Sequence, residues 1–343
     1  MKKYNNPNDI MELANAFRAS RVFLTAFELG IFSELGSESK TSEAVASSLN
    51  TNPRATERLM NALAAIGILE KQNGKFKNTP AAEKFLVKGK PGYMGGLGHT
   101  ANLWKTWSNM TESVRQGRAI EIKDAINDRG EDWLSPFIAA MHMRAKKQAP
   151  EIIAMLDLSG IENVLDVGGG PGTFSFAFVD AKKGLKATVF DLPNVIPLTQ
   201  KYIADEGYTG RVATATGDYL KDDLGNGYDL IFLSAIIHSN SPDENKLLFS
   251  KCAKALYSGG RLVVSDFIMD NSRTKPAAGA VFALNMLVGT RAGDTYTESE
   301  LKSWMEETGF SGFTRIDTNY DTSLIIGIKN KTSGIFKTPE AKK

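Results

Sequence analysis

The sequence predicts an α/β protein in which a doubly wound parallel sheet ends in an antiparallel hairpin and follows a helical domain of winged-helix type. After Asn163, buried apolar runs of strand length alternate with helical stretches, which is the pattern of a doubly wound sheet. The last two runs, residues 314–319 and 323–329, are joined by the turn Tyr320-Asp321 and predict a hairpin. The N-terminal part contains two helices joined by a tight turn, followed by another hairpin.

The composition limits the class of protein. The chain has 343 residues, of which 42% are hydrophobic and 23% charged, an ordinary globular mixture that is long enough for two domains. A net charge of +2 and a pI near 8.4 do not favour nucleic acid or an anionic membrane, so we expect neither as a partner. The one cysteine, Cys252, leaves no disulfide framework and no cysteine-based zinc site. We therefore expect no metal and a reducing compartment.

The first residues, MKKYNNPNDIMEL, turn polar directly after the lysines and contain no apolar core of a signal peptide. No run approaches the ~18 apolar residues that a membrane span needs. These two features predict a cytoplasmic protein.

Residues 9–35 carry apolar side chains at helical spacing, which predicts helices. These side chains are Ile10, Leu13, Ala14, Phe17, Val22, Leu24, Phe27 and Leu29. They are more numerous than one small domain would cover, which favours a surface that binds a partner. An ordinary core is the alternative.

Two further helices are predicted over residues 41–49 and 53–66, and a hairpin follows at the turn Asn73-Gly74. This order is typical of a winged helix-turn-helix, which alone would suggest DNA binding. The second helix, however, combines Arg54 and Arg58 with Glu57, and its remaining face is apolar. A helix that reads a groove would carry more polar and basic contacts, so we do not expect DNA binding. A winged-helix regulator that senses a ligand remains an alternative.

Residues 163–174 read NVLDVGGGPGTF and form the most informative stretch of the chain. The sequence predicts a buried strand over residues 164–167, a glycine turn and then a helix from Thr173. Unpaired N–H groups at a helix N-terminus bind polar ligands. Gly168, Gly170 and Gly172 are spaced GxGxG, and no Lys-Ser/Thr follows, so the turn is not a P-loop.

Two carboxylates flank this turn. Asp166 stands directly before the first glycine and suits a cationic ligand, and Asp191 ends the next predicted strand, where a ribose diol would bind. The combination resembles the S-adenosylmethionine site of class I methyltransferases more than a nicotinamide site. A glycine turn that serves only the fold is the alternative.

The remaining strand ends carry further polar side chains, and ligands of such sheets collect at the carboxyl ends of the strands. Asp218 and Tyr219 follow the predicted strand 212–216. Ser234 ends the strand 230–234, and His238 comes four residues later. Asp266 lies in the last parallel strand, residues 261–267.

Five sequence blocks occur in a fixed order: VLDVGGGPG, VFDLPNVI, GDYL, LSAIIHSNSPDE and GGRLVVSDFI. In this order they resemble the O-methyltransferase family that includes the plant caffeate enzymes, acetylserotonin methyltransferase and many bacterial natural-product methyltransferases. The resemblance covers nearly the whole chain. It implies a class I methyltransferase fold and a homodimer formed through the N-terminal helices. It also implies that the winged helix dimerises and shapes a pocket rather than reading DNA.

The resemblance carries roles to individual positions. It implies that Gly168 and Gly170 approach the methionine part of S-adenosyl-L-methionine, that Asp191 binds the ribose, that Asp218 and Tyr219 bind the adenine, and that His238 is the general base. We expect Asp266 to orient or charge-stabilise His238, as a carboxylate does in other histidine-based sites. The residues expected to bind the cofactor are Asp166, Gly168, Gly170, Asp191, Leu192, Asp218, Tyr219 and Ser234. The residues expected to line the substrate site are Met141, His142, Asn285, Met286 and Arg291.

The family implies four segments: a winged-helix dimerisation domain (residues 1–95), a helical linker that lines the pocket (96–150), the S-adenosylmethionine domain (151–330) and a mobile tail (331–343). The expected reaction is methyl transfer to a hydroxyl of a small aromatic or heteroaromatic metabolite. N- or C-methylation, or a different reaction on the same fold, is the alternative. The chain departs from the plant enzymes in four places: His238-Ser239-Asn240 replaces their His-Asp-Trp, Asp266 replaces a glutamate, Ser234 replaces a lysine, and Thr295 aligns with a second glutamate.

Overall fold

The computed structural model describes residues 4–120 and 130–331. These residues group into two compact units, one within residues 1–105 and 131–140, the other within residues 106–130 and 141–343. Helices α7 (Leu97–Trp107) and α9 (Glu131–Ala154) each continue from one unit into the other. The predicted domain boundaries at residues 95 and 150 stay predictions, and the predicted tail beyond Lys331 lies outside the described residues.

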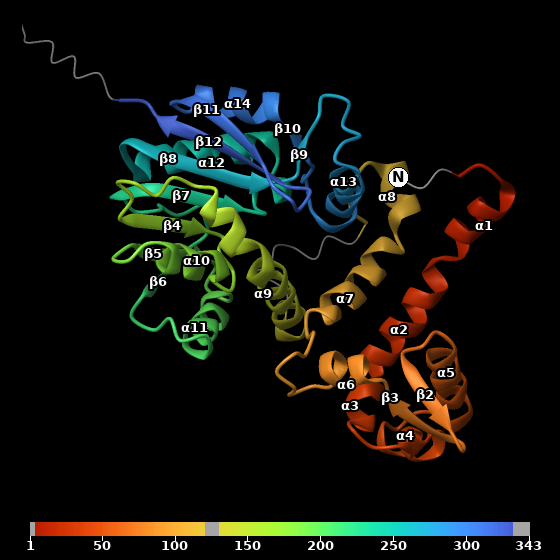
Figure 1. The fold of residues 1–343 in the computed structure, drawn as a ribbon. Coiled ribbons are helices and arrows are strands. Elements are labelled where there is room, and N and C mark those ends of the chain that lie inside the picture. The colour runs from red at the N-terminus through yellow and green to blue at the C-terminus, as the bar shows by residue number, and fades with distance from the viewer. Residues whose placement is uncertain (1–3, 121–129, 332–343) are drawn as a thin grey trace, which may run out of the picture. The chain divides into compact units, whose positions relative to one another are not determined.

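The first unit is mainly helical and carries a three-stranded antiparallel sheet in the order β1-β3-β2 (Figure 1). The strands are β1 (Lys40–Thr41), β2 (Leu69–Gln72) and β3 (Lys75–Asn78), and the helices are α1 (Pro7–Asn15), α2 (Phe17–Leu29), α3 (Ile31–Leu35), α4 (Ser42–Ser48), α5 (Pro53–Ala65) and α6 (Pro80–Leu86). The predicted hairpin is confirmed, with Asn73 and Gly74 at φ of 50° and 76°, as a two-residue hairpin turn requires. Helix α5 begins as its sequence predicts, because Asn52 accepts from the amide of Ala55 and Pro53 occupies the first turn.

The apolar face of α5 is core. Met60 and Leu63 are fully buried against Phe32, Val45 and Phe76. By contrast, α1 buries none of its side chains. The apolar side chains of α1, which belong to the set predicted to bind a partner, are therefore not buried within this chain.

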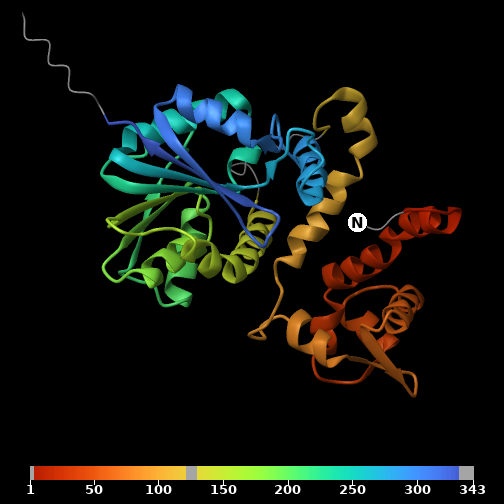
Figure 2. The ribbon, with the colours of Figure 1, turned by 45° about the horizontal axis from the view of Figure 1, so that its top comes forward.

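The second unit contains a seven-stranded sheet in the order β11-β12-β8-β7-β4-β5-β6. Its strands are β4 (Asn163–Val167), β5 (Lys186–Asp191), β6 (Val212–Thr216), β7 (Tyr228–Ser234), β8 (Leu256–Asp266), β11 (Phe310–Asp317) and β12 (Ser323–Lys329). Strands β4 to β8 pair in parallel, whereas β12 is antiparallel to both of its neighbours. Figure 2 shows the hairpin β11-β12 in blue along one edge of the sheet. The predicted doubly wound sheet with a terminal hairpin is confirmed.

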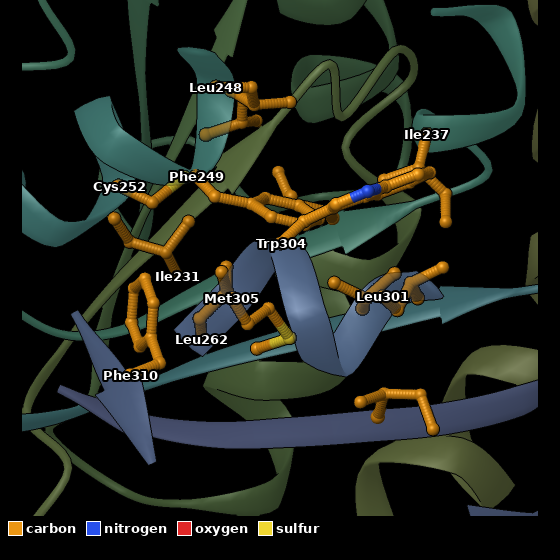
Figure 3. Packing of buried hydrophobic residues seen from close by; sticks show 14 of the residues in the cluster. Ile231, Ile237, Leu248, Phe249, Cys252, Leu262, Leu301, Trp304, Met305 and Phe310 are labelled. Carbon is orange, nitrogen blue, oxygen red and sulfur yellow. The ribbon is translucent and has the colours of Figure 1, made fainter. Parts of the chain in front are cut away.

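Helices cover both faces of this sheet (Figure 1). Those nearest to it are α10 (Thr173–Ala181) and α11 (Ile196–Asp205) on one face, and α12 (Pro242–Ala255) and α14 (Glu298–Glu307) on the other. Alternate side chains of β7 feed the two cores: Ile231 faces α12 and α14, and Phe232 faces α10. In Figure 3, Ile231 lies in one cluster with Phe249 of α12 and Trp304 of α14.

Several elements were not predicted. Helices α8 (Met110–Gln116) and α13 (Ala277–Gly289), and the short parallel pair β9 (Ile268–Met269) and β10 (Tyr296–Thr297), complete the second unit. Helix α13 reads AAGAVFALNMLVG and is apolar all round, so it has no helical period to recognise. Among the described residues, no helix combines the length and apolar character required to cross a membrane.

Candidate active site

The glycine turn follows β4 and brings backbone close to other groups. Gly168 has φ of 66°, and a Cβ at this position would lie 2.3 Å from Cδ1 of Ile236. The amide of Gly168 donates to the carbonyl of Phe190 at 2.7 Å, which fixes the turn against the end of β5. Only glycine fits both the left-handed backbone and the close approach.

Asp191 ties the tip of β5 to this turn. One carboxylate oxygen accepts from the amide of Gly170 at 2.8 Å, and the other accepts from the amide of Leu192 at 2.7 Å. On the other side, the hydroxyl of Thr199 in α11 donates to the carbonyl of Gly170 at 2.6 Å. Each oxygen of Asp191 keeps lone-pair capacity, so a diol can still bind there.

The two carboxylates of the turn are not compensated by a cation among the described residues. Asp166 is 1% exposed, and burial raises its pKa to about 7, although Ser175 donates to it at 2.9 Å. Burial also raises the pKa of Asp191 to about 6, although two amides donate to this carboxylate. A cationic ligand would offset this cost, because an opposite charge favours the ionised form. The site therefore fits a ligand that combines a positive charge with a diol.

The end of β6 supplies the next two predicted residues. The Asp218 carboxylate accepts from the amide of Leu220 at 3.0 Å and forms an ion pair with Lys221 at 3.0 Å, so it already shapes its own loop. The Tyr219 hydroxyl donates to Oδ1 of Asn240 at 3.0 Å. Burial raises the pKa of Tyr219. The phenol therefore stays neutral, and its ring is held in place.

A sharp turn follows β7 and carries the histidine. Ser234 ends β7 opposite Ser265 of β8, and Ala235 has a left-handed φ of 58°, a strained conformation for a residue other than glycine. The short helix η2 (Ile237–Ser239) then places His238 with its side chain only 9% exposed. This strained turn directs the chain from the end of β7 toward Asp266.

His238 and Asp266 form a pair. Nδ1 of His238 lies 2.9 and 3.0 Å from the two carboxylate oxygens of Asp266, which also accepts from the amide of Phe267 at 2.8 Å. A carboxylate accepts hydrogen bonds, so it favours the tautomer with the proton on Nδ1 and a lone pair on Nε2. Within the described residues, Nε2 of His238 has no hydrogen-bond partner. The arrangement can accept a proton at Nε2 and stabilise the resulting imidazolium.

Comparison with known proteins identifies the family. A family model described as O-methyltransferase domain matches residues 107–311, and one described as O-methyltransferase dimerisation domain matches residues 11–88. The chain belongs to the O-methyltransferase family. It is similar to 3-hydroxy-5-methyl-1-naphthoate 3-O-methyltransferase of Streptomyces sahachiroi, with 32% identity over 89% of this chain and 90% of that protein.

Of two further similar proteins, the second was solved with the product of the cofactor. Acetylserotonin O-methyltransferase of Bos taurus is 30% identical over 88% of this chain and 91% of that protein. The solved structure of PigF with SAH (S-adenosylhomocysteine) has a TM-score of 0.86 and 25% identity, and the alignment covers 95% of this chain and 100% of PigF. The enzyme is an S-adenosylmethionine-dependent O-methyltransferase with a dimerisation domain at its N-terminus.

Two residues beside the histidine of this O-methyltransferase were not predicted. The Phe282 ring packs edge-on against His238, with ring centroids 4.8 Å apart. A Cβ at Gly293 would lie 2.3 Å from the His238 carbonyl, so position 293 has no room for a side chain. A lone glycine in GDTY and a phenylalanine in an apolar helix carry no signal in the sequence. Thr295, at the position of the second plant glutamate, donates to the carbonyl of Gly279 at 3.4 Å and is buried away from solvent.

The structure separates the residues predicted to line the substrate site of the O-methyltransferase. Asn285 and the buried Met286 lie on α13 with Phe282, and Asn285 accepts from the indole N–H of Trp107 at 2.7 Å. Arg291 is 75% exposed at its side chain and forms an ion pair with Glu244 at 2.7 Å. A substrate role for these residues stays a prediction.

Met141 and His142, the two residues of α9 that were predicted to line the substrate site, differ in their contacts. Met141 is half-buried. His142 contacts Thr173, the first residue of α10, with Nδ1 lying 2.8 Å from Oγ1, and its Nε2 lies 3.3 Å from Glu206. Both ring nitrogens of His142 therefore have protein partners, Thr173 at the start of α10 and Glu206 at the end of α11.

Proposed function

We propose that this chain transfers a methyl group from S-adenosylmethionine to a hydroxyl of a small aromatic or heteroaromatic metabolite, with His238 as the general base. The observation that carries the proposal is the His238–Asp266 pair, which leaves Nε2 available to accept a proton. The similarity to a naphthoate 3-O-methyltransferase supports the aromatic class of acceptor.

The proposed cofactor residues surround the turn between β4 and α10. Asp166 would supply negative charge beside the sulfonium, Asp191 would accept from the ribose hydroxyls, and Gly168 and Gly170 would let the backbone approach. Leu192, Asp218, Tyr219 and Ser234 would complete the site from the neighbouring strand ends. When bound, S-adenosylmethionine supplies an electrophilic methyl group on a positively charged sulfur.

The base must overcome an unfavourable proton transfer. A phenol has a pKa near ~10 and an unperturbed histidine one near ~6.5, so complete transfer in the ground state is uphill by several pK units. His238 would therefore take the proton as the oxygen–carbon bond forms. Asp266 would orient the ring and stabilise the imidazolium, as a buried carboxylate does in other histidine-based sites.

Positioning would supply most of the rate enhancement. Holding two reactants in line can contribute ~7–11 kcal/mol. The apolar rings of Phe282 and Phe267, whose centroids are 4.9 Å apart, would exclude water beside His238. Thr295 occupies the position of the second glutamate of the plant enzymes. Asp266 would therefore be the one carboxylate that orients His238 and stabilises its imidazolium.

The decisive experiment compares His238→Ala with the native protein. Calorimetric titration with SAH should give the native Kd, because the side chain is not part of the proposed cofactor site. Methyl transfer from labelled S-adenosylmethionine to a panel of naphthols and hydroxylated heteroaromatics should fall by roughly 10²–10⁴-fold. A variant that methylates at the native rate would remove the base role alone. Absence of SAH binding to the native protein would overturn the cofactor site itself.

The same labelled methyl group tests the alternatives. Label on oxygen supports the proposal, and label on nitrogen or carbon supports the other transferases of this fold. Turnover of the acceptor without label in the product would point to a different reaction in the same site.

A further inference from the structure

A buried chain of hydrogen bonds runs from the end of β6 to the turn that carries His238. The Tyr219 hydroxyl donates to Oδ1 of Asn240 at 3.0 Å, and Nδ2 of Asn240 donates to Oδ1 of Asn245 at 3.1 Å. Nδ2 of Asn245 then donates to the carbonyl of Ile237 at 2.9 Å. Asn240 and Asn245 are 3% and 0% exposed, so water cannot replace a missing partner.

The direction of this chain is fixed by its last member. The Ile237 carbonyl can only accept, so Asn245 must present its NH₂ group there and its oxygen toward Asn240. Asn240 must in turn present its NH₂ group to Asn245 and its oxygen to Tyr219. The Tyr219 hydroxyl is left with the donor role. Reversing either amide would set two acceptors against each other in the interior, where a lost hydrogen bond is not replaced by water.

The backbone of Asn240 is held as firmly as its side chain. The hydroxyl of the buried Tyr296 donates to the Asn240 carbonyl, and the Asn240 amide donates to the carbonyl of Ile237 at 3.3 Å. His238 lies between Ile237 and Asn240 in the chain, both of which are held by hydrogen bonds, and its ring is held by Asp266. The turn is therefore attached to β6 through Asn240 and to β8 through Asp266.

We infer that Asn240 is a positioning residue that couples Tyr219, at the proposed adenine end of the cofactor site, to the turn that presents His238. The inference rests on the proposed function for the roles of those two residues.

The test uses the full-length protein and two variants. Asn240→Leu keeps a similar volume and removes both amide bonds, and Tyr219→Phe removes only the hydroxyl. We expect each variant to raise the Kd for SAH and to lower kcat roughly tenfold, with little change in the KM for the acceptor. The control is Asn78→Leu, because Asn78 is a buried asparagine of the first unit that donates to the carbonyls of Phe32 and Gly36, both at 2.8 Å.

The control should lower the Tm and leave the Kd for SAH and kcat unchanged. If Asn240→Leu lowers the Tm to the same extent but binds SAH and turns over like the native protein, the residue is only structural and the inference is wrong. If Asn240→Leu does not fold, Tyr219→Phe decides, and native values for its Kd and kcat overturn the inference. The Kd for SAH does not depend on a base, so a failed His238 proposal and a failed Asn240 inference give different results.

Discussion

The carboxylate of Asp191 accepts a hydrogen bond from the amide of Gly170 at 2.8 Å, while its backbone carbonyl accepts from the amide of Gly217 at 2.9 Å. This residue of β5 is therefore bonded to the turn after β4 and to the turn after β6. Three strand ends of the cofactor site are joined at one position. A change at Asp191 should affect the whole site rather than one contact.

Replacing Asp191 with asparagine should weaken SAH binding and remove part of its pH dependence. The ionised carboxylate accepts from a diol, whereas the protonated form must donate. Because burial raises the pKa of Asp191 to about 6, the native Kd for SAH should rise as the pH falls through that value. The Asp191→Asn variant should bind at least about tenfold more weakly at pH 8 and lose this contribution.

Calorimetric titration between pH 5 and pH 8 provides the measurement. SAH carries no sulfonium, so the titration isolates the ribose contact from the charge on sulfur. Parallel pH profiles for the native protein and the variant would show that Asp191 does not bind the ligand through its charge.

Asp166 should lower the stability of the free protein at neutral pH. Its folded pKa of about 7 lies above the usual aspartate value because of burial. Between about pH 4 and pH 7 the folded state then binds more protons than the unfolded state, so stability is lost as the pH rises. The Asp166→Asn variant lacks this titration. The difference in free energy of unfolding, variant minus native protein, should therefore be larger at pH 8 than at pH 5 by roughly 1–3 kcal/mol.

Urea denaturation at the two pH values measures this difference. Asp317→Asn is the control, because the Ser323 hydroxyl and Arg315 lower the pKa of Asp317. That carboxylate is ionised in the folded and the unfolded state at both pH values, so the difference between Asp317→Asn and the native protein should be the same at pH 5 and pH 8. A constant difference between Asp166→Asn and the native protein would contradict the burial argument.

Asp266→Asn should impair catalysis while leaving the cofactor site intact. An asparagine amide would set its NH₂ group or its oxygen against Nδ1 of His238 and would provide no charge for the imidazolium. We expect kcat to fall by roughly 10²–10⁴-fold with an unchanged Kd for SAH. Stopped assays with labelled cofactor give kcat, and a native kcat would show that the histidine does not act through this carboxylate.

Much of the cofactor site could be predicted because it lies at strand ends. Parallel strands buried on both faces appear as short apolar runs, and the polar residue that ends each run must lie at one edge of the sheet. Asp191 was identified in this way. Asp166 was identified because it stands directly before the first glycine of the turn, and His238 because it follows the strand that ends at Ser234 and matches a block of the family. The parallel register of β4, β5 and β7 then brings their ends together.

The surroundings of these residues could not be predicted, because they depend on tertiary contacts. Phe282 lies on a helix without periodicity, and Asn240 gains its role only when Tyr219 and Asn245 reach it from other elements. Arg291 is typical of a residue that binds an anionic substrate, yet an ion pair with Glu244 already engages it. Spacing along the chain contains none of this information.

His142 should act on the cofactor turn rather than on the acceptor. The ion pair with Lys146 lowers the pKa of Glu206, so this carboxylate is ionised and accepts from Nε2 of neutral His142. Nδ1 is then the acceptor for the hydroxyl of Thr173, at the start of α10. Burial lowers the pKa of His142, which favours the neutral ring. His142→Ala should raise the Kd for SAH about threefold to tenfold, corresponding to one lost hydrogen bond.

Lys146→Met is the matched control, since the exposed ion pair it removes should change binding less than about twofold. Calorimetry with SAH and the KM for the acceptor distinguish two roles of His142. A raised acceptor KM with an unchanged Kd for SAH would instead support its predicted place in the substrate site.

The apolar face of α1 should form the dimer contact. Ile10, Met11 and Leu13 are 58%, 58% and 57% exposed in the single chain, and the match to a dimerisation domain begins at residue 11. Burying one such side chain contributes about 1.5–3 kcal/mol, and burying a charge in its place is costly. Leu13→Glu should therefore dissociate the dimer, and light scattering should give the mass of one chain, 37.3 kDa, at micromolar concentration.

Leu247→Glu is the control, because Leu247 is also exposed but lies on α12 of the second unit. It should leave the mass of two chains unchanged, since no dimerisation segment includes it. A dimer that persists in Leu13→Glu and dissociates in Leu247→Glu would move the contact to the second unit. If both variants remained dimers at nanomolar concentration, the exposed face of α1 would have to be covered by something other than a second copy, because an apolar helix face in water favours association.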